Sequence, residues 1–320
     1  MSADLVSVIV LSWNSRKFLE GCLRSVLAQT HPRVELIVVD NASTDGSAEL
    51  VRGLFPQVDL VVNDRNLGFC AGNNVGLKRA GGVYILFLNA DALLEPTYLE
   101  EALKPFAADR RVGSCAGKVR RFERRWLDTT GQVLTRSRRV KERGYGEVDR
   151  GQYDQPGEVF SVCGAVALYR RETIDAVSVD DQFFDEDFFA FGEDFDAGWR
   201  AQNMGWRCAY QPSAVAAHYR GGTQIGAGRR SRRLEMTRRP PEIQAHIIKN
   251  RYLAMIKNDS PGALVVNLPF ILAWDLLLWG YLLIGSRGTL KHLWRSRGLL
   301  RRAVAKRRAL RSRAAAWASS

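Results

Sequence analysis

The sequence of 320 residues predicts an α/β fold, in which a mostly parallel sheet is flanked by helices and followed by a helical extension. In residues 1–100, β-branched apolar runs alternate with segments whose apolar residues recur at helical spacing. This alternation predicts parallel strands, because each crossover helix returns the chain to the same edge of the sheet. The net charge of +13 lies in the last third, since residues 221–320 hold 20 Lys and Arg against 4 Asp and Glu. That imbalance marks the extension as a separate, basic region.

Four strands are expected in the first part of the chain, each followed by a polar turn. They cover residues 5–11, 35–39, 59–62 and 84–88, with helices at 18–27, 47–55 and 68–80. Ligands of such sheets bind at the carboxyl ends of the strands. Ser12, Asp40 and Asp91 fall there, so the sequence predicts a binding site at this edge.

The pattern weakens in the rest of the chain. Residues 120–158 are rich in Arg, Gly and turn residues, and we interpret them as an insertion. The expected elements that follow are regular structure at 159–169, a strand at 213–217, a Gly/Arg-rich linker at 221–241, a helix at 246–257 and an apolar segment at 263–284.

Two acidic sites far apart in the chain are the strongest functional signal. Asn89-Ala90-Asp91 follows the fourth strand and offers hard oxygen ligands of the kind that Mg²⁺ or Mn²⁺ prefers. Glu193 and Asp194 lie among phenylalanines, where a carboxylate can act as a base. The structural alternatives are a strand-end turn for the first site and an acidic helix N-terminus for the second.

Asp40 and His218 are two further candidates. The Asp40 carboxylate can accept a hydrogen bond from the ring N–H of uracil or thymine, or it can be a turn or N-cap aspartate. His218 follows an expected strand and precedes a glycine-rich loop, so a neutral imidazole there can ligate a metal. A lone histidine is more often structural.

These segments, taken in order, resemble glycosyltransferase family 2 and are most similar to its rhamnosyltransferase-like branch over about residues 5–260. The matching segments are 6–14, 38–47, 66–74, 88–91, 164–172 and 184–200, with His218, Gly221 and Thr223 after them. The resemblance implies a GT-A, Rossmann-like fold, a nucleotide-sugar donor and inversion at the anomeric carbon. Asn89 departs from a strict DxD motif, which weakens a claim of two carboxylate ligands.

The resemblance also implies a role for each candidate residue. Asp194 would be the general base, Asp91 and His218 would bind Mg²⁺ or Mn²⁺, and Asp40 would contact the nucleotide base. The other donor-side candidates are Ser12, Asn14, Asn73 and Asn89, and the acceptor-side candidates are Glu193, Trp199 and Arg200.

The implied organisation has a catalytic domain at residues 1–225 and a basic, helical C-terminal region at 226–320. The catalytic domain would comprise a nucleotide-binding half at about 1–110 and an acceptor half at about 111–225.

The expected reaction transfers a sugar from dTDP-rhamnose, or next from a UDP-hexose, to a cell-envelope glycan or lipid-linked acceptor. The alternative is a catalytically silent scaffold of the same fold that binds glycan or lipid. A nucleotidylyltransferase is disfavoured, because no Lys-bearing glycine-rich signature follows the first strand. A nucleic-acid partner is disfavoured, because no motif for one accompanies the basic region.

The apolar segment 263–284 is long enough to span a bilayer. Asn267, Pro269 and Asp275 interrupt it, however, and both of its flanks are basic. Basic residues mixed with Trp and Leu after it fit an anionic membrane surface. No signal-peptide pattern precedes the first strand, and the five scattered cysteines form no CxxC. The sequence therefore predicts a peripheral, monotopic protein on the cytoplasmic face, which deletion of 261–320 would make soluble; the alternatives are a soluble protein with packed helices and a true span.

Overall fold

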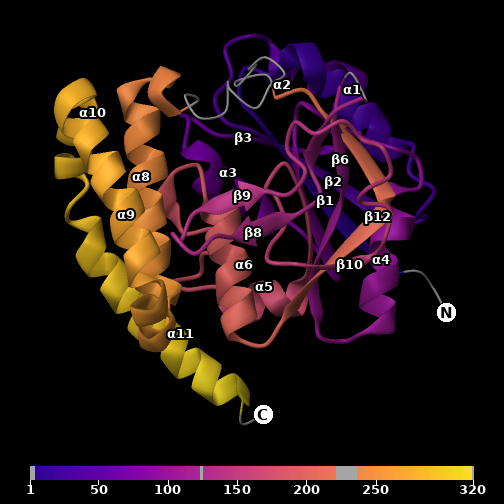
Figure 1. Ribbon diagram of the computed structural model, residues 1–320. Coiled ribbons are helices and arrows are strands. Elements are labelled where there is room, and N and C mark those ends of the chain that lie inside the picture. The colour runs from indigo at the N-terminus through magenta and orange to yellow at the C-terminus, as the bar shows by residue number, and fades with distance from the viewer. Residues whose placement is uncertain (1–3, 123–124, 221–235, 319–320) are drawn as a thin grey trace.

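The computed structural model describes residues 4–122, 125–220 and 236–318. Its centre is a ten-stranded sheet covered by helices on both faces (Figure 1). The strands are β1 Val6–Ser12, β2 Val34–Asp40, β3 Asp59–Val62, β4 Tyr84–Asn89, β5 Ala92–Leu94, β6 Val112–Arg121, β7 Leu127–Thr129, β10 Gly157–Val159, β11 Val166–Arg170 and β12 Arg207–His218. A separate two-stranded sheet contains β8 Gln132–Leu134 and β9 Val140–Glu142.

The strand order is β10-β12-β6-β11-β4-β1-β2-β3, with β5 paired to β12 and β7 paired to β6. The four expected N-terminal strands are confirmed, and they run parallel to one another. Strand β11 is antiparallel to both of its neighbours, while β12 is parallel to β6. The sheet is therefore mixed, with a parallel half that carries the strand ends predicted to bind ligand.

Alternation along the central strands separates two apolar cores, because successive side chains of a strand point to opposite faces. In β1, Val8 and Val10 belong to one core and Ile9 to the other. The helices of the first face are α1 Arg16–Leu27, α2 Ser47–Leu54 and α4 Tyr98–Ala108. Those of the second face are α3 Gly68–Leu77, α5 Arg171–Val177 and α6 Glu193–Asn203, with the short 3-10 helix η1 Glu186–Phe188 before α6.

Helix α3 lies very close to β1. A Cβ atom at Gly72 would stand 2.5 Å from Leu11 Cδ1, and one at Gly76 would stand 2.5 Å from Ile9 Cγ2. Glycine is required at both places, because any side chain would push the helix away from the strand ends.

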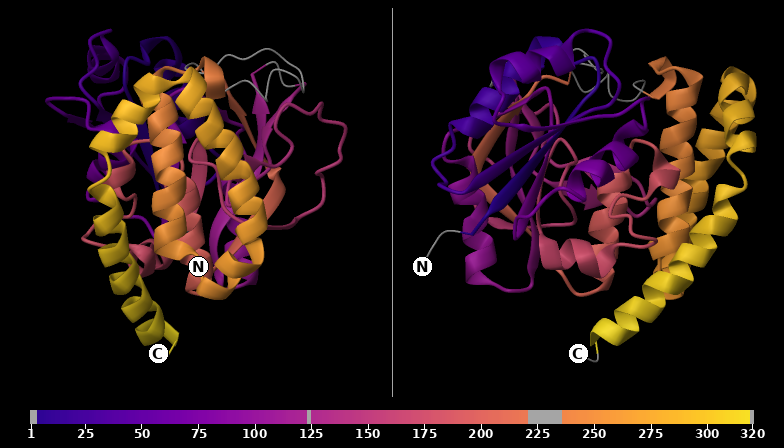
Figure 2. Two further views of the ribbon diagram at one scale, coloured as in Figure 1. Left: turned by 60° about the vertical axis from the view of Figure 1, so that its left-hand side comes forward. Right: turned by 180° about the vertical axis from the view of Figure 1, so that it is seen from behind.

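The C-terminal helices form a layer outside the second face (Figure 2). They are the 3-10 turn η2 Met236–Arg238, α8 Pro241–Asn258, α9 Pro261–Gly285, α10 Arg287–Arg295 and α11 Leu299–Ala318. Leu253 of α8 and Leu310 of α11 belong to the same core cluster as Ile9 of the central sheet. One core therefore crosses the boundary expected near residue 225. The predicted linker falls mostly on residues 221–235, with Gly221 and Thr223, which lie outside the described residues.

Candidate active site

The carboxyl ends of several strands meet at one edge of the sheet. Ser12 is paired with Asp40, and Leu11 is paired with Asn89, so β1, β2 and β4 end side by side. Beyond them, His218 at the end of β12 is paired with Ala92 of β5, directly after Asp91. The sheet thus brings together residues from the start, the middle and the far half of the chain.

Asp91 and His218 face each other across this edge. Nε2 of His218 lies 3.1 Å from Oδ1 of Asp91, and its Nδ1 lies 2.9 Å from Oδ2 of the fully buried Asp128. Asp128 also accepts a hydrogen bond from Arg220. Asp128 thereby fixes the imidazole ring and turns its Nε2 toward Asp91, as partners of metal-binding histidines commonly do.

The spacing of this pair fits a divalent cation. Two ligand atoms held at right angles about 2.1 Å from an ion are about 3 Å apart. Burial alone would lower the pKa of His218, but its hydrogen bonds to Asp128 and Asp91 outweigh burial and raise it to about 9. The two carboxylates therefore favour positive charge at this place, which suits a cation as well as a proton.

The donor-side candidates include two buried polar atoms that lack partners. Oγ of Ser12 and Oδ1 of Asp40 make no hydrogen bond within the described part of the chain. Oδ2 of Asp40 accepts from the Ser43 backbone N–H at 2.9 Å, which fixes the carboxylate at the strand end. Because an unpaired buried polar atom is costly, these two atoms indicate a ligand with its own polar groups.

The three asparagines have different surroundings. Oδ1 of Asn14 accepts from the Thr44 backbone N–H at 2.8 Å, so Asn14 joins the turns that follow β1 and β2. Asn89 ends β4 beside them. Asn73 is buried in α3 and donates to the Phe69 carbonyl one turn earlier, so its side chain serves its own helix.

Asp194 is held by three hydrogen bonds at the start of α6. Its Oδ2 accepts from the Gly164 backbone N–H at 2.7 Å and from Gln132 Nε2 at 2.8 Å. Its Oδ1 accepts from the Phe195 backbone N–H at 2.7 Å. Burial raises the pKa of Asp194, and these three donors oppose the rise. The carboxylate is therefore kept in one orientation and supported in its ionised form.

Glu193 differs from its neighbour. It is buried, and its Oε2 has no partner among the residues that the structure describes. Burial, and then the charge of Asp194, raise the pKa of Glu193 well above its usual range. The Asp194 carboxylate thus accepts three hydrogen bonds, whereas Oε2 of Glu193 accepts none from the described residues.

Trp199 and Arg200 are the other two acceptor-side candidates. Both are buried on the core side of α6. Arg200 pairs with Asp196 at 3.0 Å and donates to the Phe183 carbonyl at 2.6 Å, while Trp199 packs on Phe195. These contacts hold Trp199 and Arg200 against the core behind α6, and the acceptor-side roles of Glu193, Trp199 and Arg200 stay predictions.

A short segment connects Asp194 to the end of β4. Gly164 donates to Asp194, and the next residue, Ala165, accepts the backbone N–H of Asn89 at 2.9 Å. Asn89 stands two residues before Asp91, so this segment runs from the Asp194 carboxylate toward the Asp91–His218 pair.

Three residues of this site were missed by the sequence analysis, because they lie in the segment interpreted as an insertion. They are Asp128, Gln132 and Glu142. The one feature of the sequence that pointed to this segment is Gly131. Its φ of 101° favours glycine, and a Cβ atom added there would lie 2.7 Å from Val159. A required glycine between two polar residues indicates a tight, ordered turn.

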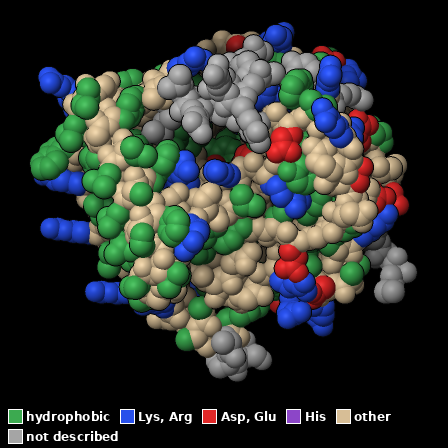
Figure 3. All heavy atoms as spheres, viewed as in Figure 1, with side chains coloured by type: hydrophobic (Ala, Val, Ile, Leu, Met, Phe, Trp, Pro, Cys, Tyr) green, Lys and Arg blue, Asp and Glu red, His purple; other side chains and the backbone are tan. Residues whose placement is uncertain are grey.

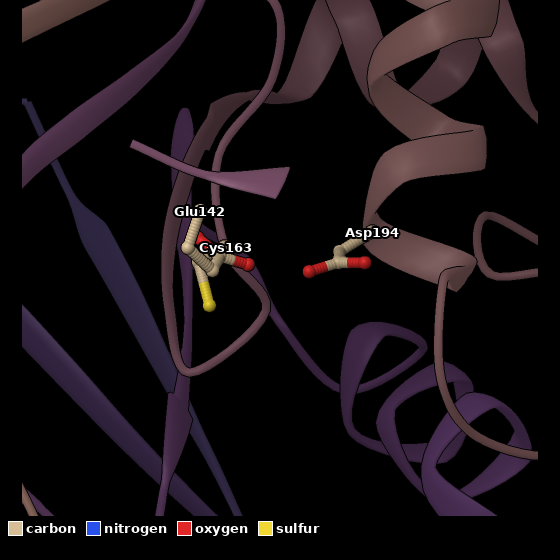
Figure 4. A group of neighbouring side chains, drawn as sticks. All are labelled: Glu142, Cys163 and Asp194. Carbon is tan, nitrogen blue, oxygen red and sulfur yellow. The ribbon is translucent and has the colours of Figure 1, made fainter. Parts of the chain in front are cut away.

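Glu142, Cys163 and Asp194 come together on the inner side of this site (Figure 4). Their ligand atoms lie within 4.8 Å of one another. Gln132 Nε2, however, donates to both carboxylates, and burial raises the pKa of the Cys163 thiol well above its usual value. A protonated thiol and two donated hydrogens do not suit a cation, so Asp91 and His218 are the better metal ligands.

Comparison with known proteins identifies the family of the chain. The family model described as glycosyl transferase family 2 matches residues 7–177. Glycosyltransferase GlyA of Streptococcus pneumoniae is 34% identical over 117 residues, which are 35% of this chain and 17% of that protein. The poly-beta-1,6-N-acetyl-D-glucosamine synthase of Staphylococcus aureus is 24% identical over 213 residues, 66% of this chain and 48% of that one. The chain spans less than half the length of the curated relatives named here.

Solved structures share the fold. GalNAc-T7 with UDP, GalNAc and Mn²⁺ has a TM-score of 0.61 at 16% identity, covering 80% of this chain and 49% of that one. The mannosyltransferase PcManGT of Pyrobaculum calidifontis, with GDP-Man and Mn²⁺, has a TM-score of 0.55 at 20% identity, covering 98% and 86%. The expected GT-A fold is confirmed, and because the family model matches more than half of the sequence, the chain belongs to glycosyltransferase family 2.

Proposed function

We propose that the protein is a metal-dependent, inverting glycosyltransferase that uses a nucleoside-diphosphate sugar. The observation that carries this proposal is the fixed Asp194 carboxylate, joined through Gly164 and Ala165 to Asn89, which stands two residues before Asp91 of the Asp91–His218 pair. Asp194 would take the proton of an acceptor hydroxyl as that oxygen attacks the anomeric carbon. The bond from this carbon to the diphosphate breaks, the diphosphate leaves with the electron pair, and the configuration is inverted. A divalent ion on Asp91 and His218 would supply positive charge for the leaving diphosphate.

The donor proposal rests on Asp40 and Ser12. Oδ1 of Asp40 and Oγ of Ser12 are buried and unpartnered among the described residues, and they lie where the nucleotide of an α/β fold binds. A carboxylate there suits the ring N–H that uracil and thymine share. The proposed donor is dTDP-rhamnose first, because of the rhamnosyltransferase-like resemblance, and a UDP-hexose next, with Asn14 and Asn89 beside the same strand ends. Structures with this fold bind UDP or GDP-Man together with Mn²⁺, which supports the metal.

A panel of nucleotide sugars tests the donor and the metal together. With Mn²⁺, the matching donor is expected to raise the melting temperature by a few degrees, because it binds only the folded protein. EDTA should remove this effect, and so should Asp91→Ala, whereas Asp59→Ala, at the start of β3 and away from the site, should keep it. An undiminished shift in EDTA would argue against Asp91 and His218 as metal ligands. Stabilisation by donors with neither transfer nor donor hydrolysis would favour the silent scaffold.

We propose a cell-envelope glycan or a lipid-linked saccharide as the acceptor. A relative named for poly-beta-1,6-N-acetyl-D-glucosamine synthesis supports this class, as does the C-terminal layer. Helix α9 is long and apolar enough to cross a membrane by length and composition. Its outward side chains are strongly exposed, for example Leu276 at 75%, Leu277 at 71% and Ile284 at 89%. Hydrophobic side chains gather over α9 and α10, with Lys and Arg projecting at their edge (Figure 3).

The packing of α9 favours a peripheral position over a span. Asp275, the one charged residue of α9, turns toward α8 and pairs with Arg251 at 2.6 Å. Arg136 and Arg139 stack on Phe270 and Trp274, with distances of 3.7 and 3.5 Å to the ring centroids. A spanning helix would lose all of these contacts and leave Asp275 in lipid. An uncharged outward face beside the basic α10 and α11 instead fits the surface of an anionic membrane.

Vesicle sedimentation tests this localisation. The protein should pellet at low salt with vesicles that contain anionic phospholipid, and high salt should release it only in part, because apolar burial is insensitive to screening. The double substitution of Leu276 and Leu277 by Glu should leave it in the supernatant. Leu54→Glu, at a leucine 52% exposed on α2, is the matched control and should still pellet. Wild-type protein that stays in the supernatant would refute the membrane proposal, and self-association without lipid would assign the face to a second copy.

A further inference from the structure

The hairpin of β8 and β9 carries two residues to the Asp194 carboxylate. Gln132 and Glu142 are directly opposite each other in this hairpin. Gln132 Nε2 donates to Glu142 Oε1 at 2.9 Å and to Asp194 Oδ2 at 2.8 Å. One amide nitrogen thus connects the hairpin to the base.

The orientation of the Gln132 amide is determined by its three partners. Its Oε1 accepts from Ser161 Oγ at 2.7 Å, while its two N–H bonds serve two carboxylates. The flipped amide would place its oxygen against Glu142 and Asp194, which are both acceptors when ionised. Thr129 donates its hydroxyl hydrogen to the other oxygen of Glu142, so both oxygens of the Glu142 carboxylate accept a hydrogen bond.

The hairpin itself is anchored away from the site. In the loop between its strands, Arg138 makes two hydrogen bonds to Asp259, at 2.6 and 2.9 Å, and both side chains are buried. Arg251 of α8 donates to the Ser137 carbonyl at 2.7 Å. With its tip fixed to the C-terminal layer, the hairpin can hold Gln132 in one place.

We propose that Gln132 and Glu142 position the Asp194 carboxylate for proton transfer, Gln132 by its hydrogen bond and Glu142 by holding Gln132 and adding a negative charge. This inference rests on the proposed function, in which Asp194 is the base. Gln132 and Glu142 are positioning residues, since they act through Asp194.

The two residues should act on Asp194 in opposite directions. An N–H donated to a carboxylate stabilises its ionised form, whereas a nearby negative charge destabilises it. Burial, and then the charge of Asp194, raise the pKa of Glu142 to about 7, so near neutral pH this neighbouring charge is partly present. The other ionisable groups around Asp194 and Glu142 are Glu193, Asp196, Cys163, Tyr169 and Arg220.

The test is the pH dependence of kcat/KM in two variants of the full chain. Glu142→Gln keeps the shape of the side chain and removes its charge, so the acid limb should move down by about one pH unit. Gln132→Met removes the donor, so the acid limb should move up by about half a unit to one unit, and kcat should fall roughly ten- to a hundredfold because Asp194 is less well aligned. Donor binding should stay unchanged in both.

Matched controls come from the same segment. Glu147→Gln and Gln152→Met change exposed residues between β9 and β10, and they should leave the pH profile unchanged. A purely structural role would lower stability without opposite shifts. Shifts in the same direction, or unmoved profiles in an active enzyme, would overturn the inference while the proposed function stands.

A second measurement does not depend on turnover. The ¹³C carboxyl signal of Asp194 in labelled protein, assigned by its loss in Asp194→Asn, should titrate lower in Glu142→Gln and higher in Gln132→Met. If no donor supports transfer, the proposed function fails, and this titration still decides whether the two residues act on Asp194.

Discussion

Replacing Asp194 with asparagine is expected to lower turnover by about 10²–10⁴-fold, because asparagine cannot accept the proton of the acceptor hydroxyl. The amide keeps the size of the side chain. Donor binding should therefore persist, since the strand-end residues are untouched. Single-turnover transfer and donor titration with Mn²⁺ would separate the two effects.

Glu193→Gln is the matched control for this substitution. It changes the adjacent carboxyl group, whose pKa is raised well above its usual range by burial and then by the charge of Asp194. A much smaller loss is expected there. Normal turnover of Asp194→Asn would reassign the base to Glu193. Asp196 is unsuited to that role, because it is fully buried and bonded to Arg200, Lys257 and Asn258.

Replacing Lys306 with methionine is expected to destabilise the fold by up to about 3–5 kcal/mol, because it removes a buried cation shared by two carboxylates and leaves Asp185 with Lys257 alone and Asp187 with Arg302 alone. The Lys306 ammonium in α11 is 8% exposed and lies 2.6 Å from Asp185 and 2.9 Å from Asp187. Both aspartates belong to the segment that leads into α6. Urea unfolding at neutral pH would measure the loss.

The stability difference between wild type and Lys306→Met should depend on pH in a definite direction. Burial alone would raise the pKa of Asp185, but Lys257 and Lys306 outweigh burial and lower it. A carboxyl group with a lowered folded-state pKa adds stability above its unfolded value of about 3.9, and this stability is lost as the pH falls through the lower folded-state value. The difference between wild type and Lys306→Met should therefore shrink in acid.

Arg302→Met provides the control in the same helix. Arg302 pairs with Asp187 at 2.8 Å, but its side chain is 60% exposed. An exposed ion pair contributes about 1 kcal/mol or less, so this variant should be nearly as stable as wild type. Equal stability of Lys306→Met and wild type would mean that α11 is not packed on the catalytic core.

The strand ends were predictable because their signals are local. An apolar run followed by a polar residue identifies each strand and its ligand-binding end, as at Ser12 and Asp40. Asp91 and His218 were paired through the family resemblance, and the structure brings them together because β5 pairs with β12. The roles of Ser12, Asn14, Asp40, Asn73, Asn89, Asp91, Asp194 and His218 stay predictions.

The contributions of the insertion and of α11 could not be read from the sequence. Strands β7, β8 and β9 are three residues long, which is too short for a periodic pattern, and the Gln132–Asp194 bond joins residues 62 apart in the chain. The basic C-terminal residues were expected at an anionic membrane surface. Lys306 is instead buried, because its ammonium group donates hydrogen bonds to Asp185 and Asp187 on the core. Only the tertiary structure brings these three residues together.

The burial of Lys306 limits how this protein could change its location over evolutionary time. The sequence alone suggested that a deletion of 261–320 would release a soluble enzyme. Such a deletion also removes Lys306, one of the cations that neutralise the segment before α6. A stop codon in this region would therefore weaken the fold of the remaining chain, whereas stepwise polar substitutions on the outward face of α9 would change that face and leave these ion pairs in place.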